Sequence, residues 1–341
     1  MESRRVDPSA PIVGACRGGA RVPLSGRGHE DASWTMTRST WARIGAALVA
    51  GTLAATLPTA AFAAPRPKPP KTPSTYVALG DSYASGTGAD SYLADGTSCY
   101  RSTNSYPVLL AGANNLVLDF QACSGATIAD VVSSQLGTLS SATTYVTVTA
   151  GGNDVGFADT ITTCLGTDTT ACLAKVAAAE GVIATELPGR LGSLFAEVRA
   201  KAPAAKVVAT TYPRLFNGRT CNLFTSFTSA EMSAMNAAAD KLAVAIRDAA
   251  AAAGVGFADV RTPFDGHAVC DSAPWINNVD ILRQYNSFHP NATGQASGYS
   301  PTVKAALGLG GKTGGGTGKP KVTTGATTST DTQRGQVRVQ G

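Results

Sequence analysis

The sequence predicts an α/β domain built on a parallel β-sheet with helices on both faces. Short apolar or β-branched runs alternate along the chain with longer segments that have helical periodicity. Strands joined through helices run in the same direction, so this alternation indicates a parallel sheet. Polar and glycine-rich groups follow three of the expected strands, and the carboxyl ends of parallel strands meet at one edge of the sheet.

Five short strands are expected. They span residues 76–79, 116–120, 145–149, 206–211 and 256–260. The third reads YVTVT, and β-branched runs of this kind are typical of buried strands. Pro213 ends the fourth strand, because proline has no backbone N–H for a further ladder bond.

The segments between the strands carry helix signals. Helices are expected at residues 105–111, 127–136, 174–200 and 229–253, and within residues 295–309. Thr127 stands where an N-cap would, and the third helix is expected to break near Pro188. Residues 156–172 and 221–228 are expected to be loops.

The N-terminal part of the chain has the three parts of a secretory signal peptide. Residues 36–63 combine two arginines, an apolar run and an A-x-A cleavage site at Ala61-Phe62-Ala63. We therefore expect translation to start at Met36, residues 1–35 to be an upstream extension foreign to the native protein, and the mature protein to be secreted. The apolar run is too interrupted to predict a membrane span.

Composition separates the domain from its flanks. Residues 64–73 form a proline-rich spacer, and residues 310–341 are rich in Gly and Thr, so we expect a disordered tail there. Residues 74–309 have a plausible size for one domain. Residues 64–309 carry 16 basic and 18 acidic side chains, a net charge of −2, whereas the whole chain carries +5. The domain therefore has no basic surface typical of nucleic-acid binding.

Six cysteines follow the expected signal peptide, and Cys16 lies before it. An even number of cysteines in a secreted protein predicts disulfide bonds. Six cysteines allow fifteen pairings, of which pairing between sequence neighbours is the simplest: Cys99–Cys123, Cys164–Cys172 and Cys221–Cys270. The chain has no C-x-x-C pair, and His267 and His289 are the only histidines of the domain, so no metal site is expected.

Candidate catalytic groups gather at the expected carboxyl edge. Ser82 follows the first strand, two residues after Gly80, where a sharp turn would expose its hydroxyl beside backbone N–H groups. Gly125 follows the second strand, Asn153 follows the third, and His289 precedes the last helix. These segments offer a hydroxyl, a glycine N–H, a side-chain amide and an imidazole. Each of these residues could instead have a purely structural role in a turn.

Four blocks in this order resemble the SGNH hydrolases, also called GDSL esterases and lipases. Gly80-Asp81-Ser82 looks like the first block of that family, and Gly125 like its glycine block. Gly151-Gly152-Asn153-Asp154 is similar to the GxND block, and His289 before Pro290 resembles the last block. The resemblance implies a three-layer, flavodoxin-like α/β/α sandwich with a five-stranded parallel sheet. The cysteines and the leader are similar to those of secreted actinobacterial lipases and phospholipases.

The resemblance implies a role for each of these residues. Ser82 would be the nucleophile and His289 the general base, while the N–H groups of Ser82 and Gly125 and the Asn153 side chain would form the oxyanion hole. His267 competes for the role of base, but its segment follows the fifth strand and lies near Cys270. The α/β-hydrolase motif G-x-S-x-G is a more distant template, because Ala84 occupies its last position.

The chain departs from the family pattern at one position. The acid expected three residues before the histidine is replaced by Asn286. We therefore expect a Ser82–His289 dyad in which the main-chain carbonyl of Asn286 accepts the imidazole N–H. Two alternatives stay open: the Asn286 side chain could orient the ring, or a remote acid among Asp265, Asp271 and Asp280 could complete a triad.

These assignments predict an ester hydrolase that needs no cofactor and acts as a monomer on small-molecule or lipid esters. Apolar residues in the expected loops could form the walls of an acyl groove: Phe157, Ile161, Leu165, Leu223, Phe224 and Phe227. Two other functions stay open. One is a carbohydrate acetyl esterase on the same fold, and the other is a non-catalytic surface-binding protein.

Overall fold

The computed structural model of the chain describes residues 73–220, 227–310, 321–324 and 337–340. The expected extension, signal peptide and cleavage site lie outside the described residues. The same holds for Cys221, Leu223 and Phe224.

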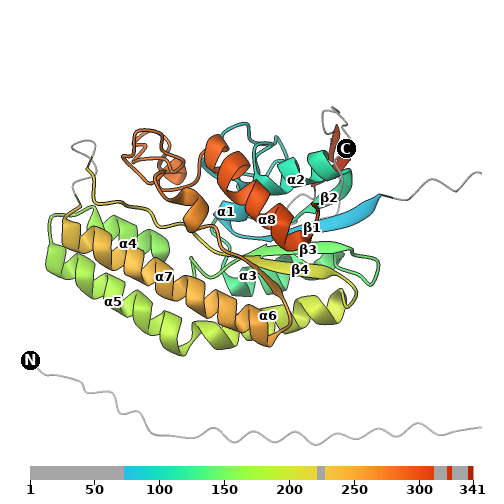
Figure 1. Cartoon of the computed structure of the whole chain (residues 1–341), viewed down its shortest axis with the longest axis horizontal. Coiled ribbons are helices and arrows are strands. Elements are labelled where there is room, and N and C mark those ends of the chain that lie inside the picture. The colour runs from blue at the N-terminus through green and yellow to red at the C-terminus, as the bar shows by residue number, and fades with distance from the viewer. Residues whose placement is uncertain (1–72, 221–226, 311–320, 325–336, 341) are drawn as a thin grey trace, which may run out of the picture. The chain divides into compact units, whose positions relative to one another are not determined.

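The described residues form a parallel sheet with β1 (Ser74–Gly80) at its centre (Figure 1). On one side of β1 lies β2 (Leu116–Phe120), and on the other lie β3 (Tyr145–Thr149), β4 (Lys206–Thr210) and β5 (Gly256–Ala258). All pairings among these five strands are parallel, and the register sets Gly80 opposite Thr149. The predicted five-stranded parallel sheet is confirmed.

Two strands that the sequence did not predict extend this sheet. β7 (Val337–Gln340) pairs antiparallel with β2, and β6 (Lys321–Thr324) pairs antiparallel with β7. These residues therefore depart from the expected disordered tail. The physical reason is that β2 would otherwise be an edge strand, whose unpaired N–H and C=O groups can accept any extended segment.

Helices cover both faces of the sheet (Figure 1). One face carries α2 (Tyr106–Asn114) and α8 (Ser300–Leu307), and the other carries α3 (Ile128–Ser134), α6 (Leu187–Lys201) and α7 (Ser229–Ala252). α5 (Thr169–Thr185) packs against α7 and α6. The described residues also form short helical turns: α1 (Ser82–Ser85), η1 (Leu136–Thr138), η2 (Thr262–Phe264), η3 (Gln284–Asn286) and the π-turn η4 (Gly294–Tyr299). No helix within the described ranges has the length and apolar character that a membrane crossing requires.

Local signals explain where several helices begin. Thr127 is the N-cap of α3, as predicted, and forms a capping box with Asp130. Thr228 and Glu231 form the same arrangement at the start of α7. The expected break between α5 and α6 comes at Glu186, so that Pro188 falls in the first turn of α6, where its missing N–H costs no hydrogen bond.

One helix lies where a loop was expected. Residues 157–164 form α4 (Phe157–Cys164), which begins after Gly156 and packs against α5. Its threonines at positions 160, 162 and 163 donate their hydroxyls to backbone carbonyls four residues earlier. These local bonds satisfy the threonine hydroxyls within the helix, so polar side chains are compatible with α4.

Disulfides tie loops to the sheet and to the helices. The sulfur atoms of Cys99 and Cys123 are bonded, which joins the loop after α1 to the segment that follows β2. Cys164 and Cys172 are also bonded and close the connection between α4 and α5. Cys270 is disulfide-bonded as well, and its predicted partner, Cys221, lies outside the described residues.

We predict that Gly80→Ala will destabilise the fold severely. Gly80 has φ +131°, and a Cβ there would stand 2.1 Å from the carbonyl oxygen of Thr149. Strain and backbone displacement together should lower the free energy of unfolding by at least about 3 kcal/mol. Chemical denaturation measures this loss. The matched control is Gly137→Ala, where a Cβ meets nothing within 4 Å, and equal stability of the two variants would contradict the prediction.

Candidate active site

The turn at the end of β1 delivers Ser82 to the carboxyl edge of the sheet. Asp81 donates its backbone N–H to the Thr149 carbonyl at 2.9 Å, which holds the turn against β3. Its carboxylate caps α1 by accepting the Tyr83 N–H at 3.0 Å. Ser82 is thus the first residue of a short helix, with only 7% of its surface exposed and its hydroxyl directed to one partner, His289.

Two buried glutamines hold the same turn from opposite sides. The Gln135 amide accepts the Gly80 N–H at 2.7 Å and donates to the Gly80 carbonyl at 2.9 Å, as a neighbouring strand would. The Gln295 amide accepts the Tyr106 N–H at 2.9 Å and donates to the Tyr83 carbonyl at 3.0 Å. Both side chains are buried, so the backbone on either side of Ser82 has fixed hydrogen-bond partners.

His289 meets Ser82 through its ring. The Nε2 atom lies 2.8 Å from Ser82 Oγ, and Nδ1 lies 3.0 Å from the carbonyl oxygen of Ser287. A carbonyl can only accept, so Nδ1 carries the proton and Nε2 is left to accept from the serine hydroxyl. The arrangement is therefore the one that a serine–histidine pair needs before it reacts.

The expectation that the Asn286 carbonyl accepts the imidazole N–H is wrong. That carbonyl instead accepts the backbone N–H of His289 at 3.2 Å, which closes a turn over Ser287 and Phe288. Ser287 has φ −58° and ψ 134°, and Phe288 has φ +60°. These angles are close to those of a type II turn. In that turn the peptide between the two central residues has the opposite orientation to that in a type I turn. The Ser287 carbonyl belongs to that peptide, and this orientation directs it to the ring.

The Asn286 side chain has a different partner. It is buried, and its Oδ1 accepts the Tyr92 hydroxyl at 2.7 Å. The Tyr92 oxygen in turn accepts the Gly88 N–H at 2.9 Å. The side chain therefore links the histidine turn to the loop after α1 and does not orient the ring.

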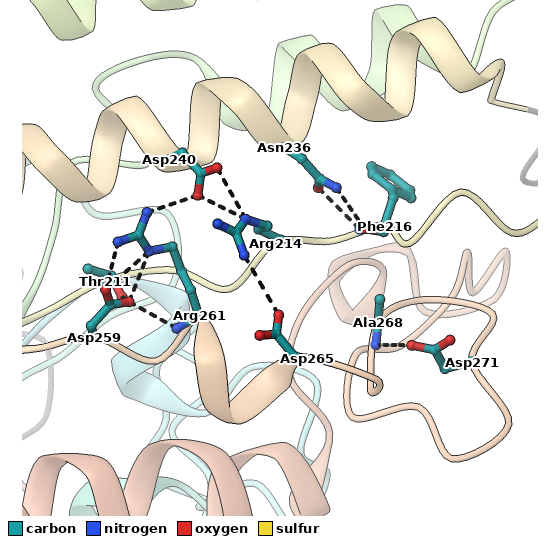
Figure 2. Close-up of polar contacts among 10 residues, drawn as sticks. All are labelled: Thr211, Arg214, Phe216, Asn236, Asp240, Asp259, Arg261, Asp265, Ala268 and Asp271. Atoms are coloured by element: carbon teal, nitrogen blue, oxygen red, sulfur yellow. Dashed lines mark hydrogen bonds and ion pairs between the residues drawn. The ribbon is translucent and has the colours of Figure 1, made fainter.

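The three candidate acids bond groups other than the His289 ring. Figure 2 shows Asp265 directed to Arg214, at 3.7 Å, and Asp271 accepting the Ala268 N–H at 2.7 Å. Asp280 accepts backbone N–H groups of its own loop at 2.9 and 3.1 Å. In the part of the chain that the structure describes, no carboxylate bonds the His289 ring, and its N–H has a backbone acceptor.

Two tyrosines join the catalytic segments. The Tyr83 hydroxyl donates to the Phe288 carbonyl at 2.7 Å, and its ring centroid lies 5.2 Å from that of His289. The Tyr212 hydroxyl donates to Asp81 Oδ2 at 2.5 Å and accepts the Gly152 N–H at 3.0 Å. One tyrosine thus fixes the histidine turn to α1, and the other fixes the segment of Asn153 to the serine turn.

The predicted oxyanion donors surround the serine turn. Within the described residues, the N–H groups of Ser82 and Gly125 have no hydrogen-bond acceptor. Gly125 is exposed, with φ +80°. Asn153 Nδ2 donates one hydrogen to the Ala126 carbonyl at 2.9 Å, which holds its amide beside the glycine turn. Asp154 has a structural partner, because its Oδ2 accepts the Ile128 N–H at 2.9 Å.

Burial sets the protonation of the site. It lowers the pKa of His289 from 6.5 to about 4, against the opposing effect of the backbone carbonyls of Ser287 and Tyr285. It also raises the pKa of Asp81 from 3.8 to about 7, although the bonds from Tyr212 and Tyr83 favour the carboxylate. The imidazole is therefore neutral near pH 7 and able to accept a proton.

His267 does not reach this site. Its Nδ1 lies 2.7 Å from the Ala273 carbonyl, and its ring stacks on Trp275 with centroids 3.7 Å apart. Among the described residues, no group of three or more His, Cys, Asp or Glu side chains is arranged to hold a metal ion.

An apolar cavity begins at Ser82 and Asn153 and continues between α4, α5 and α7. Phe157 and Ile161 line it, as the sequence suggested. Leu165 does not line it and is 38% exposed. Phe227 is buried elsewhere, against Phe216 and Phe288.

Sequence reasoning missed the residues that support the site, which are Tyr83, Tyr92, Gln135, Tyr212, Ser287 and Gln295. Gln135 did carry a signal. It follows Ile128 and Val131 at helical spacing, on the buried side of α3, and an amide on an apolar face needs a polar partner. Nothing in the sequence indicated that the partner is Gly80.

Comparisons with known proteins agree with this geometry. A sequence model of the GDSL-like Lipase/Acylhydrolase family matches residues 78–296. The chain is 45% identical over 233 residues to Lipase 1 of Streptomyces coelicolor, a match that covers 68% of this chain and 86% of that protein. Among solved structures, it is similar to phospholipase A1 from Streptomyces albidoflavus NA297, with 42% identity, a TM-score of 0.67, and coverage of 69% and 100%. The extracellular lipase from Streptomyces rimosus gives 43% identity, a TM-score of 0.66, and coverage of 68% and 99%.

We predict that the acid limb of kcat/KM lies below pH 6. A histidine that acts as a base must be neutral, so activity is present above its pKa and is lost as the pH falls through it. Burial moves that pKa down from 6.5, toward about 4. The measurement is a pH-stat profile with a soluble short-chain ester. The Asp81→Asn variant removes the second titrating group of the site, and its kcat/KM profile should keep the same acid limb. A midpoint at or above 6.5 would contradict the prediction.

We also predict that Asn286→Ala keeps kcat within roughly tenfold of the parent, because the ring acceptor is a backbone carbonyl. The variant leaves the Tyr92 hydroxyl without its acceptor, so unfolding free energy should fall by about 1–3 kcal/mol. Kinetics and thermal denaturation measure the two effects separately. The same retention is expected for Asp265→Asn, Asp271→Asn and Asp280→Asn. A loss of about 10⁴-fold in any one of these, as in an aspartate triad, would show that a remote acid is required.

Proposed function

The chain belongs to the GDSL-like lipase and acylhydrolase family and is a carboxylic ester hydrolase; from this premise we propose that it is secreted and cleaves lipid esters through an acyl-enzyme on Ser82. The observation that carries the mechanism is the 2.8 Å contact between Ser82 Oγ and His289 Nε2, with Nδ1 bonded to the Ser287 carbonyl. This contact supplies a nucleophile, its base and a fixed ring tautomer.

In the first half-reaction, Ser82 Oγ attacks the ester carbonyl carbon while its proton passes to His289 Nε2. The carbonyl oxygen becomes an oxyanion, which accepts hydrogen bonds from the N–H groups of Ser82 and Gly125 and from the Asn153 amide. The ester C–O bond then breaks. The alcohol leaves with the proton from His289, and the acyl group remains on Ser82.

In the second half-reaction, water replaces the alcohol. The water oxygen attacks the acyl carbon while its proton passes to His289 Nε2, and the new oxyanion accepts hydrogen bonds from the same three donors. The bond to Ser82 Oγ breaks, and the serine recovers the proton from His289. The Ser287 carbonyl stabilises the imidazolium in both steps through its bond to Nδ1. None of these steps calls for a cofactor.

Three observations support a secreted enzyme that acts on lipids. The similar proteins include two lipases and a phospholipase A1, and one of the lipases is described as extracellular. In addition, residues 36–63 have the pattern of a secretory leader. The apolar cavity beside Ser82 also favours an acyl chain over a sugar.

A fluorophosphonate probe tests the proposed nucleophile. We predict that the native protein is labelled once, on the peptide that contains Ser82. Ser82→Ala should lose the label, and His289→Ala should lose most of the labelling rate, because the hydroxyl then has no base. Mass spectrometry of the digested protein identifies the labelled residue. Absence of label from the folded native protein would favour a non-catalytic surface-binding role.

Chain-length profiling tests the substrate class separately. Initial rates on p-nitrophenyl esters from acetate to palmitate should show activity beyond the shortest chains. Activity confined to acetate would remove the lipid assignment and favour a carbohydrate acetyl esterase, while leaving the Ser82–His289 mechanism in place.

A further inference from the structure

The cavity beside Ser82 has two chemically distinct ends. Its catalytic end is polar and includes Asp81, Asn153 and the Tyr212 ring. Beyond these groups, most lining residues are aliphatic or aromatic, and ten of the lining residues come from α4, α5 and α7. Figure 1 shows these helices packed beside one another on one side of the sheet. A ligand would therefore keep its polar group near Ser82 and extend an apolar part between the helices.

Apart from Ser82 and Asn153, the polar side chains that line the cavity already have partners. The Thr160 hydroxyl donates to the Gly156 carbonyl at 2.9 Å. The Tyr212 hydroxyl donates to Asp81 and accepts from Gly152. A sugar would bury hydroxyls without partners there, at a cost in free energy, whereas an aliphatic chain needs none. The chemistry of the walls thus fits an uncharged, unbranched acyl chain.

The two longer helices line the cavity with the same spacing. α5 contributes Val176, Ala179 and Ile183, and α7 contributes Met235, Ala238 and Leu242. In both sets, a small residue stands three positions after one large residue and four before the next. Positions three and four apart share one face of a helix. Each helix therefore presents a gap between two bulky side chains.

A third small residue, Ala239, lies next to Ala238 in the lining. Well-packed helix pairs fill the space between them to a density that leaves few voids larger than a water molecule. Alanine methyl groups at the centre of the α5–α7 contact leave space that leucines would fill. The position of the alanines thus accounts for a cavity at this place in the helix layer.

We propose that Ala179, Ala238 and Ala239 are specificity-determining residues that set the length of acyl chain the enzyme accepts. This inference rests on the proposed ester hydrolase function and deepens it. The acyl chain of the substrate, and of the acyl-enzyme, lies in the cavity between α5 and α7, while the alcohol part stays outside. Each methylene buried there contributes roughly fourfold to binding.

The test enlarges one alanine at a time. Ala238→Leu and Ala179→Leu should lower kcat/KM for p-nitrophenyl laurate at least tenfold. The value for p-nitrophenyl acetate should stay within threefold, because neither residue touches the reacting atoms. The ratio of the two values is the readout, and a purely structural defect would lower both.

The chain offers matched controls. Ala237 and Ala178 are exposed neighbours on the same helices and do not line the cavity. Ala237→Leu and Ala178→Leu should leave the laurate-to-acetate ratio unchanged. Because a leucine at position 238 fills empty space, the melting temperature of the Ala238→Leu variant should equal or exceed that of the parent protein. If Ala238→Leu fails to fold, Ala238→Val replaces it with a smaller reduction of the same ratio.

A binding measurement separates this inference from the proposed function. Calorimetry with sodium laurate and the Ser82→Ala protein should show binding that Ala238→Leu weakens at least tenfold and Ala237→Leu does not. Wild-type protein without esterase activity would overturn the proposed function, and laurate binding that depends on Ala238 would still support an acyl site. If the protein hydrolyses esters but the laurate-to-acetate ratio of kcat/KM is unchanged in Ala238→Leu and Ala179→Leu, the inference is wrong and the proposed function stands.

Discussion

The close approach of Gly80 to the end of β3 is the constraint on which the site depends. No residue with a Cβ fits there, because that atom would stand 2.1 Å from the Thr149 carbonyl oxygen. The contact lets the chain turn sharply and bond Asp81 N–H to Thr149. Ser82 then begins a helix directly above the sheet, with the segment of Asn153 beside it. The two buried glutamines stabilise the same backbone, so the position of the hydroxyl is set by main-chain geometry.

The histidine is positioned by the same means. Its ring is held by a peptide carbonyl in a tight turn, and the turn is held by a positive φ at Phe288. A phenylalanine in that conformation is strained by about 1–3 kcal/mol and persists only where its surroundings require it. Phe288 is buried and packs its ring against Phe216 and Phe227. Hydrophobic burial therefore stabilises the backbone that orients the proposed base.

Chemistry and selectivity come from different layers of the fold. The carboxyl edge of the sheet brings together Ser82, Gly125, Asn153 and His289, which would act on any ester. The helix layer of α4, α5 and α7 holds the apolar cavity in which we propose that the acyl chain lies. Changes at the contact between α5 and α7 can therefore alter substrate preference without moving the reacting groups.

The sequence by itself determined the order of the five parallel strands and of the longer helices between them, because periodicity and caps such as Thr127 act over a few residues. It also predicted Ser82 and His289 as the reacting pair, because their blocks are local motifs, and the structure places these two side chains 2.8 Å apart. Tertiary structure decided the rest: that Ser287 and not Asn286 bonds the imidazole, that Gln135 holds Gly80, and that β7 pairs with β2. Which carbonyl bonds the histidine ring depends on the rotation of a single peptide plane. The Gln135–Gly80 bonds and the pairing of β7 with β2 depend on contacts between segments far apart in the chain. Neither kind of information is present in a pattern of residue types, because it arises only when the elements pack.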